Sequence, residues 1–247
     1  KLLFKYIPKS YLEEFSAFRN FSIKWHLKNK NCKGFLTANS IHSDEIFKYV
    51  VAFDQGIPLS IIQHGAGYGM SKFISAEDYE TSLSSKFYSW GWSKYKLSHP
   101  KLNFYKQIDY LKNDRIVLTF PSLTSYSGII ESIHINYVEK ETIIINTDKF
   151  IQNVVPKIKE KIFKRELKYY FLRELKIQNK IKDDTHNDFL KSLKETRIHV
   201  TNHFGTPFLE SIAMNIPTIM ILNNYENHFR DEVLKIINEM KFEKIIF

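Results

Sequence analysis

The sequence contains a single cysteine, Cys32, among 247 residues. One thiol cannot form an intrachain disulfide, and it excludes a zinc site built from cysteines. No apolar run reaches the roughly 18 residues typical of a membrane-spanning helix, and residues 1–8 lack the apolar stretch and cleavage site of a signal peptide. We therefore expect a cytoplasmic protein that is soluble or, at most, peripheral on the inner face of the membrane. With 43% apolar and 26% charged residues, the chain is also neither disordered nor collagen-like.

Acidic residues are fewer than basic ones: 27 Asp and Glu oppose 36 Lys and Arg, which gives a net charge of +9. This balance favours anionic partners. Ten of the basic residues lie between positions 157 and 182, among only three glutamates. That basic segment is either a solvated helix face with its loop, or a surface for phosphate or an anionic membrane. No nucleic-acid-binding motif accompanies it, so we expect no nucleic acid as partner.

Two stretches read as alternating strands and helices, which predicts an α/β chain with parallel sheets. The N-terminal stretch has a short strand at 34–38, a helix from about 43 to 55 and a strand at 59–62. The C-terminal stretch has helices at 187–193, 206–214 and 225–240, with strands at 197–200, 218–222 and 244–247. Between them we predict strands at 115–120 and 166–172 and a helix around 150–163. The region 93–114 has no consistent period, and we place the domain boundary there, giving domains 1–98 and 99–247.

The first candidate site is a glycine-rich loop that follows the strand at 59–62. In open α/β sheets, ligands bind beyond the carboxyl ends of strands, and glycines let a backbone approach a ligand closely. The spacing of these glycines differs from the dinucleotide fingerprint, so a nicotinamide site is not favoured. The histidine of the loop, His64, is either a general base or a donor to a ligand, or it is a residue held by local hydrogen bonds. The loop comprises Gln63, His64, Gly65, Ala66, Gly67, Tyr68 and Gly69.

The second candidate site lies where the strand at 197–200 leads into the helix at 206–214. Thr206 is a good N-cap and Pro207 suits the first helical position, so the positive end of a helix dipole would face a ligand phosphate. Glu210, one turn later, could accept hydrogen bonds from sugar hydroxyls, although a helix dipole alone also favours an acid there. The remaining residues of this site are Thr201, Asn202, His203 and Gly205.

Two further features stay open. Trp90 and Trp92 could stack on a sugar or base, but such aromatic pairs are more often part of a core. Arg230 and Asp231, beyond the strand at 218–222, could clamp a phosphate or could form a surface ion pair. The sequence has no P-loop, no nucleophile elbow and no zinc-protease motif, which argues against kinases and hydrolases.

At these residues the sequence resembles a family of transferases found in bacterial O-antigen and surface-polysaccharide gene regions. The N-terminal part of the resemblance is the run 62–69 with residues 77–79 and 88–92; the C-terminal part is the stretch 201–230, including Thr206, Phe208, Leu209 and Glu210. Family members are usually longer at both ends, so this chain could be a fragment.

The resemblance implies a GT-B-type glycosyltransferase, in which two Rossmann-like domains face a cleft that holds a nucleotide sugar. It implies that Gly205, Thr206 and Glu210 bind the nucleotide, that His64 and its loop serve the acceptor, and that Arg173 at a strand end contacts phosphate. It also implies neither a metal nor a cofactor, with the nucleotide sugar as donor and a glycan or a lipid-linked molecule as acceptor. The alternatives are a nucleotide-sugar epimerase of similar architecture and a non-catalytic sugar- or nucleotide-binding module.

Overall fold

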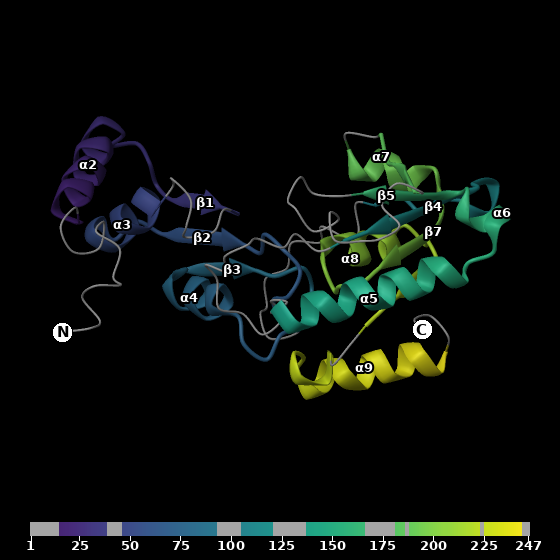
Figure 1. Ribbon diagram of the computed structural model, residues 1–247. Coiled ribbons are helices and arrows are strands. Elements are labelled where there is room, and N and C mark those ends of the chain that lie inside the picture. Colours follow the sequence, from purple (N-terminus) through teal and green to yellow (C-terminus); the bar gives the residue numbers. More distant parts are fainter. Residues whose placement is uncertain are drawn as a thin grey trace. The chain divides into compact units, whose positions relative to one another are not determined.

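The computed structural model describes residues 15–38, 46–92, 105–120, 137–165, 181–185, 188–222 and 225–243. The chain divides into two compact units, whose helices and strands are labelled in Figure 1. Unit 1 comprises residues 1–64 and 76–99, and unit 2 comprises residues 65–75 and 100–247. The predicted boundary at 98/99 lies outside the described residues. Among those that are described, no helix is both long and apolar enough to cross a bilayer.

Unit 1 is built on a parallel sheet of three strands in the order β1-β2-β3. The strands are β1 (Phe35–Thr37), β2 (Leu59–Ile62) and β3 (Lys86–Tyr88), and the helices are α2 (Phe15–Lys28), α3 (Ile46–Gln55) and α4 (Ser75–Leu83). The first strand, the helix after it and the second strand form the predicted parallel βαβ unit, in which Phe35 pairs with Leu59. Gly56, with φ 63°, follows the end of α3 as the sequence predicts.

Unit 2 contains a parallel sheet of five strands in the order β6-β5-β4-β7-β8. Its strands are β4 (Arg115–Thr119), β5 (Ile162–Arg165), β6 (Lys182–Asp183), β7 (Thr196–Thr201) and β8 (Thr218–Met220). Its α-helices are α5 (Tyr137–Asn153), α6 (Pro156–Lys159), α7 (Phe189–Lys194), α8 (Thr206–Ala213) and α9 (Asp231–Phe242). Two short 3-10 helices, η3 (Tyr110–Lys112) and η6 (Tyr225–Asn227), complete the described elements.

The central strands of the unit 2 sheet are apolar, as expected for parallel strands that are covered on both faces. Val117 and Leu118 of β4 are fully buried, and Leu118 is opposite Val200 of β7. One face packs against Ile144 and Ile151 of α5. The two middle strands are thus fixed by burial, which places the residues at their carboxyl ends along one edge of the sheet.

Two predicted helices differ from the structure. The helix predicted around 150–163 is wrong, because α5 ends at Asn153 before Pro156, and β5 already begins at Ile162. The helix predicted from 225 to 240 begins only at Asp231, after the short η6. The strands predicted at 166–172 and 244–247 lie outside the described residues. Helices α2 and α4 and strand β3 were not predicted.

Candidate functional site

The glycine-rich loop after β2 is shaped by two left-handed backbone positions. Gly67 has φ 110° and Gly69 has φ 74°, conformations that L side chains rarely adopt. The amides of Met70 and Ser71 both donate to the carbonyl of Gly67, which closes the loop into a tight turn. Glycine at these two positions is therefore a requirement of the backbone. The sequence placed this loop in the N-terminal domain, whereas the contacts of residues 65–75 group it with unit 2.

This loop contacts the start of α8, so the two motifs that the sequence singled out meet within unit 2. The amide of Ala66 donates to Oγ1 of Thr206 at 3.3 Å. The 140 residues between the two partners make this a contact of the tertiary fold. A hydroxyl that accepts one hydrogen bond keeps its own proton to donate, so Thr206 can serve the loop and a ligand at once.

The far end of the loop is fastened by the segment that leads into α9. The amide of Arg230 donates to the carbonyl of Met70 at 2.9 Å, and its side-chain Nε donates to the carbonyl of Ser71 at 2.8 Å. Ser71 also pairs with Phe229 in an isolated antiparallel β-bridge. Arg230 thus positions the loop through backbone carbonyls, a role that neither of the two sequence interpretations anticipated.

Helix α8 begins at Thr206, the first residue of the predicted helix at 206–214, but its N-cap differs from the prediction. Gly205, with extended backbone, is the N-cap and Thr206 is the first helical residue, so the prediction of Thr206 as N-cap is wrong. The amides of Phe208 and Leu209 donate to the carbonyl of Gly205, and Pro207 has no N–H. Among the described residues of this turn, the groups that could bind an anion are therefore the Thr206 amide and the positive end of the helix dipole.

His203 lies directly against the helix start. Its Nδ1 is 3.2 Å from Oγ1 of Thr201, and that hydroxyl also donates to the His203 carbonyl. A Cβ at Gly205 would lie only 2.5 Å from Nε2 of His203, so any side chain there would displace the His203 ring. Burial lowers the pKa of His203 to about 4, and the ring is therefore neutral near pH 7.

Asn202 supplies a buried acceptor beside the same turn. Asn202 is only 4% exposed, and its Nδ2 donates a hydrogen bond to Oγ1 of Thr147 on α5 at 3.4 Å. Its Oδ1 has no hydrogen-bond partner in the part of the chain that is described. A buried amide oxygen without a donor is costly, by about 1–3 kcal/mol. It is therefore a candidate acceptor for an N–H or O–H of a ligand.

Glu210, one turn into α8, is buried and engaged with a residue that the sequence analysis missed. The phenol of Tyr105 donates to Oε1 of Glu210 at 2.6 Å. Burial, and then the hydrogen bond and charge of Glu210, raise the pKa of Tyr105 above its usual value. No sequence signal links these residues, because the partner lies 105 positions away and precedes η3 outside any motif.

Below this site, His199 joins three elements through its two ring nitrogens. Nε2 is 2.8 Å from Oγ1 of Thr119 on β4, and Nδ1 is 2.8 Å from Oγ of Ser211 on α8. Because Ser211 donates its proton to the carbonyl of Pro207, it accepts from Nδ1–H, and Nε2 then accepts from Thr119. Burial, and secondarily the charge of His203, lower the pKa of His199 to about 3. The ring is thus a neutral strut between β4, β7 and the first turns of α8.

In unit 1, His64 is at the carboxyl end of β2 and has a carboxylate behind it. Its side chain is 36% exposed, and Nδ1 is 3.7 Å from Oε1 of Glu80, whose side chain is fully buried on α4. Glu77, three residues earlier on the same helix, is also buried. An exposed imidazole backed by a buried carboxylate is the arrangement of a general base with its orienting group. Glu80 was missed, although its spacing from Glu77 could have indicated a shared helix face.

Gln63 has a structural role in unit 1. It is buried, and its Oε1 accepts from the amide of Trp90 and from Nε1 of Trp92, both at 2.8 Å. The side chain thereby ties the end of β2 to the turn that contains Gly91, whose φ is 112°. Trp90 is buried as well, which favours the core interpretation of the tryptophan pair over a sugar platform.

Of the other residues that the sequence singled out, Tyr68 of the loop is buried, and Arg173 lies outside the described residues. In the described part of the basic segment, three cations pair with aspartates: Lys161 with Asp114, Lys164 with Asp183, and Arg165 with Asp184. Within the described residues, no three His, Cys, Asp or Glu side chains gather where they could hold a metal ion.

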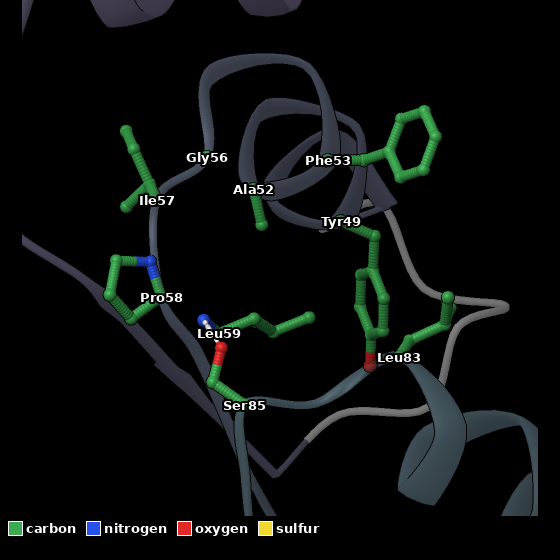
Figure 2. A pocket seen from close by; sticks show the side chains of 9 residues that line it. All are labelled: Tyr49, Ala52, Phe53, Gly56, Ile57, Pro58, Leu59, Leu83 and Ser85. Carbon is green, nitrogen blue, oxygen red and sulfur yellow. Dashed lines mark hydrogen bonds between the residues drawn. The ribbon is translucent and has the colours of Figure 1, made fainter.

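A separate pocket in unit 1 lies at the opposite, amino end of its sheet. It has a volume of about 350 Å³. Figure 2 shows Ile57 and Pro58 on one side of it and Tyr49 and Leu83 on the other, while the ring of Phe53 points away. Since catalytic sites of open parallel sheets lie at the carboxyl ends of the strands, this pocket is not the candidate active site.

Comparisons with known proteins agree with this architecture. A family model described as LIC12162 family transferase matches residues 1–247. The solved structures that resemble the chain include a candidate UDP-N-acetylglucosamine 2-epimerase from Listeria monocytogenes, with a TM-score of 0.50 and 11% sequence identity. The match covers 89% of this chain and 64% of that one, so the chain spans under two thirds of its length. No curated protein matches the sequence. The predicted α/β, GT-B-like fold with parallel Rossmann-like sheets is confirmed, as is the resemblance to a transferase family.

Proposed function

Because the chain belongs to the LIC12162 transferase family, we propose that it transfers a sugar from a nucleotide-activated donor to a growing surface polysaccharide or a lipid-linked acceptor. The observation that carries this proposal is the meeting of the glycine-rich loop with the start of α8, through the Ala66 amide and Thr206. The acceptor class and a location at the cytoplasmic face of the membrane belong to the proposal. They come from the resemblance to transferases of O-antigen gene regions.

Unit 2 would bind the nucleotide part of the donor. The Thr206 amide and hydroxyl and the positive end of α8 would contact a phosphate, and the loop at Gly67 and Gly69 allows close backbone approach. The unsatisfied Oδ1 of Asn202 and the carboxylate of Glu210 would accept hydrogen bonds from ligand N–H or O–H groups. Neutral His203 adds a ring nitrogen at the same turn without adding charge. Arg173 remains a candidate phosphate ligand.

In unit 1, His64 would act as the base. With Nδ1 directed at Glu80, Nε2 is the nitrogen that would accept the proton of an acceptor hydroxyl. The acceptor oxygen then bonds to the anomeric carbon while the bond from that carbon to the phosphate oxygen breaks. The leaving phosphate takes the electron pair and is stabilised by the helix dipole and the Thr206 donors. This scheme uses neither a metal nor a cofactor.

An epimerase is the second candidate, and the observation that favours it is the fold shared with the Listeria structure. An epimerase would convert a nucleotide sugar without any acceptor. A transferase would release free nucleotide only when an acceptor is supplied, apart from slow hydrolysis. A non-catalytic binding module would do neither.

The test is calorimetric binding of a panel of CMP, CDP, UDP, GDP and dTDP. We expect one nucleotide to bind best, and Thr206→Val and Glu210→Ala each to weaken it by about tenfold, the loss of one hydrogen bond to a charged group. Glu239→Ala, an exposed carboxylate on α9, is the matched control and should bind as wild type. His64→Ala should bind the nucleotide normally and lose turnover. Equal binding by wild type and both site variants would refute the proposed site.

A further inference from the structure

Helix α2 has apolar residues both on the side that packs within unit 1 and on its exposed side. Its inner face includes buried Ser22 and the ring of Trp25, whose centroid is 5.6 Å from that of Phe35 on β1. Its outer face carries Phe21 and Leu27, which are 56% and 57% exposed. In a helix that served only to cover the sheet, the outer face would be polar. The exposed pair therefore calls for an explanation beyond the core of unit 1.

The same outer face is basic. At 100° per residue, Lys24 and Lys28 lie between Phe21 and Leu27, and the four residues together span about a third of the helix circumference, centred on Lys24. Lys30 and Lys33 follow in the exposed turn before β1. Residues 15–38 contain five cations and no Asp or Glu. Of these cations, Arg19 pairs with Asp54 of α3.

We propose that this α2 face, comprising Phe21, Lys24, Leu27, Lys28, Lys30 and Lys33, docks on the surface of a lipid bilayer rich in anionic headgroups. The positive charge of the α2 face favours an anionic bilayer over a second copy of this chain as its binding partner. Lysines attract anionic lipid, while exposed Phe and Leu side chains enter the boundary between headgroups and acyl chains. A second copy of the same face would bring like charges together and would be repelled.

Two other surfaces of the chain lack this combination. The described part of the basic segment, at 157–165, exposes Ile158 beside Lys157, but the acid Glu160 lies next to them. Its Lys161 and Lys164 pair with aspartates. Helix α9 exposes Ile236 and Phe242 beside two lysines, but its own acids are Asp231, Glu232, Glu239 and, at its end, Glu243. The α2 face alone among these three combines exposed apolar residues with cations and no acid, and α9 provides a matched control.

The test is co-sedimentation of the nucleotide-free chain with vesicles of phosphatidylcholine containing about 30% phosphatidylglycerol. We expect binding that weakens as NaCl is raised from about 0.1 to 0.5 M, because salt screens the lysines. Lys24→Gln/Lys28→Gln should bind about 25-fold more weakly, about fivefold for each lysine. Phe21→Ser/Leu27→Ser should lose about tenfold. Lys235→Gln/Lys241→Gln on α9 should bind as wild type.

Three results would overturn the proposal: equal binding by the α2 variants and wild type, equal binding to vesicles of phosphatidylcholine alone, or no vesicle binding together with self-association that Phe21→Ser abolishes. All substituted side chains are exposed, and circular dichroism would verify folding. Since no nucleotide is present, this test is independent of the proposed catalytic function.

Discussion

Replacing His199 with glutamine should remove a steep pH dependence from the stability of unit 2. In the native state, burial holds the pKa of this histidine at about 3, whereas in the unfolded chain it returns to 6.5. Between these values the unfolded state binds a proton that the native state does not. The stability that neutral, buried His199 contributes to the native state is therefore fully present above pH 6.5 and is lost as the pH falls toward 3.

The size of the effect follows from the two pKa values. Each pH unit in that window costs about 1.4 kcal/mol for one proton. From pH 7.5 to pH 4.5, His199 should therefore reduce the free energy of unfolding by about 2–3 kcal/mol. This is a large part of the total of about 5–15 kcal/mol that is typical of a domain.

The assay is urea unfolding followed by far-ultraviolet circular dichroism at pH 7.5 and pH 4.5. Tryptophan fluorescence would not suffice, because Trp25, Trp90 and Trp92 all belong to unit 1. His199→Gln should be less stable than wild type at pH 7.5 but lose about 2–3 kcal/mol less on acidification. Thr119→Val is the control, since it removes one hydrogen bond of the same strut but retains the titrating ring. Parallel losses in wild type and His199→Gln would refute the assignment of His199 as a buried neutral ring.

Three other substitutions test the geometry of the site. Gly67→Ala should destabilise the loop by about 1–3 kcal/mol because its φ is 110°, and should weaken nucleotide binding in calorimetry; wild-type stability and binding would contradict this role of the turn. Gly205→Ala should displace His203, whose Nε2 would lie 2.5 Å from the new Cβ, and shift its ring resonances in NMR spectra; unchanged resonances would contradict that packing. Tyr105→Phe should lower the free energy of urea unfolding by about 1–3 kcal/mol and weaken nucleotide binding several-fold, since Glu210 loses the donor that orients it; wild-type behaviour would show that the phenol does not position the carboxylate.

The parts of the fold that the sequence predicted are those with local signals. The strand at 59–62 is a short apolar run bounded by Pro58 and a glycine loop, and the helix beginning at Thr206 has Pro207 in its first turn. Where local signals conflict, the prediction failed. Apolar and basic residues at 150–163 suggested one helix, but Pro156 interrupts it and the pairing of Ile162 with Ile116 draws the following residues into the sheet.

In the candidate site, too, features with local sequence signals were predicted and long-range contacts were not. The loop and the start of α8 were both recognised from glycine and capping patterns, but their contact through Ala66 could not be, because it depends on tertiary structure. Glu80 behind His64, Tyr105 beside Glu210 and the strut at His199 are likewise long-range partners. Single residues at these positions have no periodicity or spacing that distinguishes them from ordinary surface or core residues.

The most direct test of the account is hydrogen–deuterium exchange of the chain with and without the nucleotide that binds best. We predict slower exchange in peptides that cover residues 65–72 and 201–210, because the loop and the start of α8 would both contact the phosphate. Exchange across the unit 1 pocket, residues 49–59 and 83–85, should not change. Protection at that pocket, with none at 201–210, would contradict the assignment of the nucleotide site to unit 2.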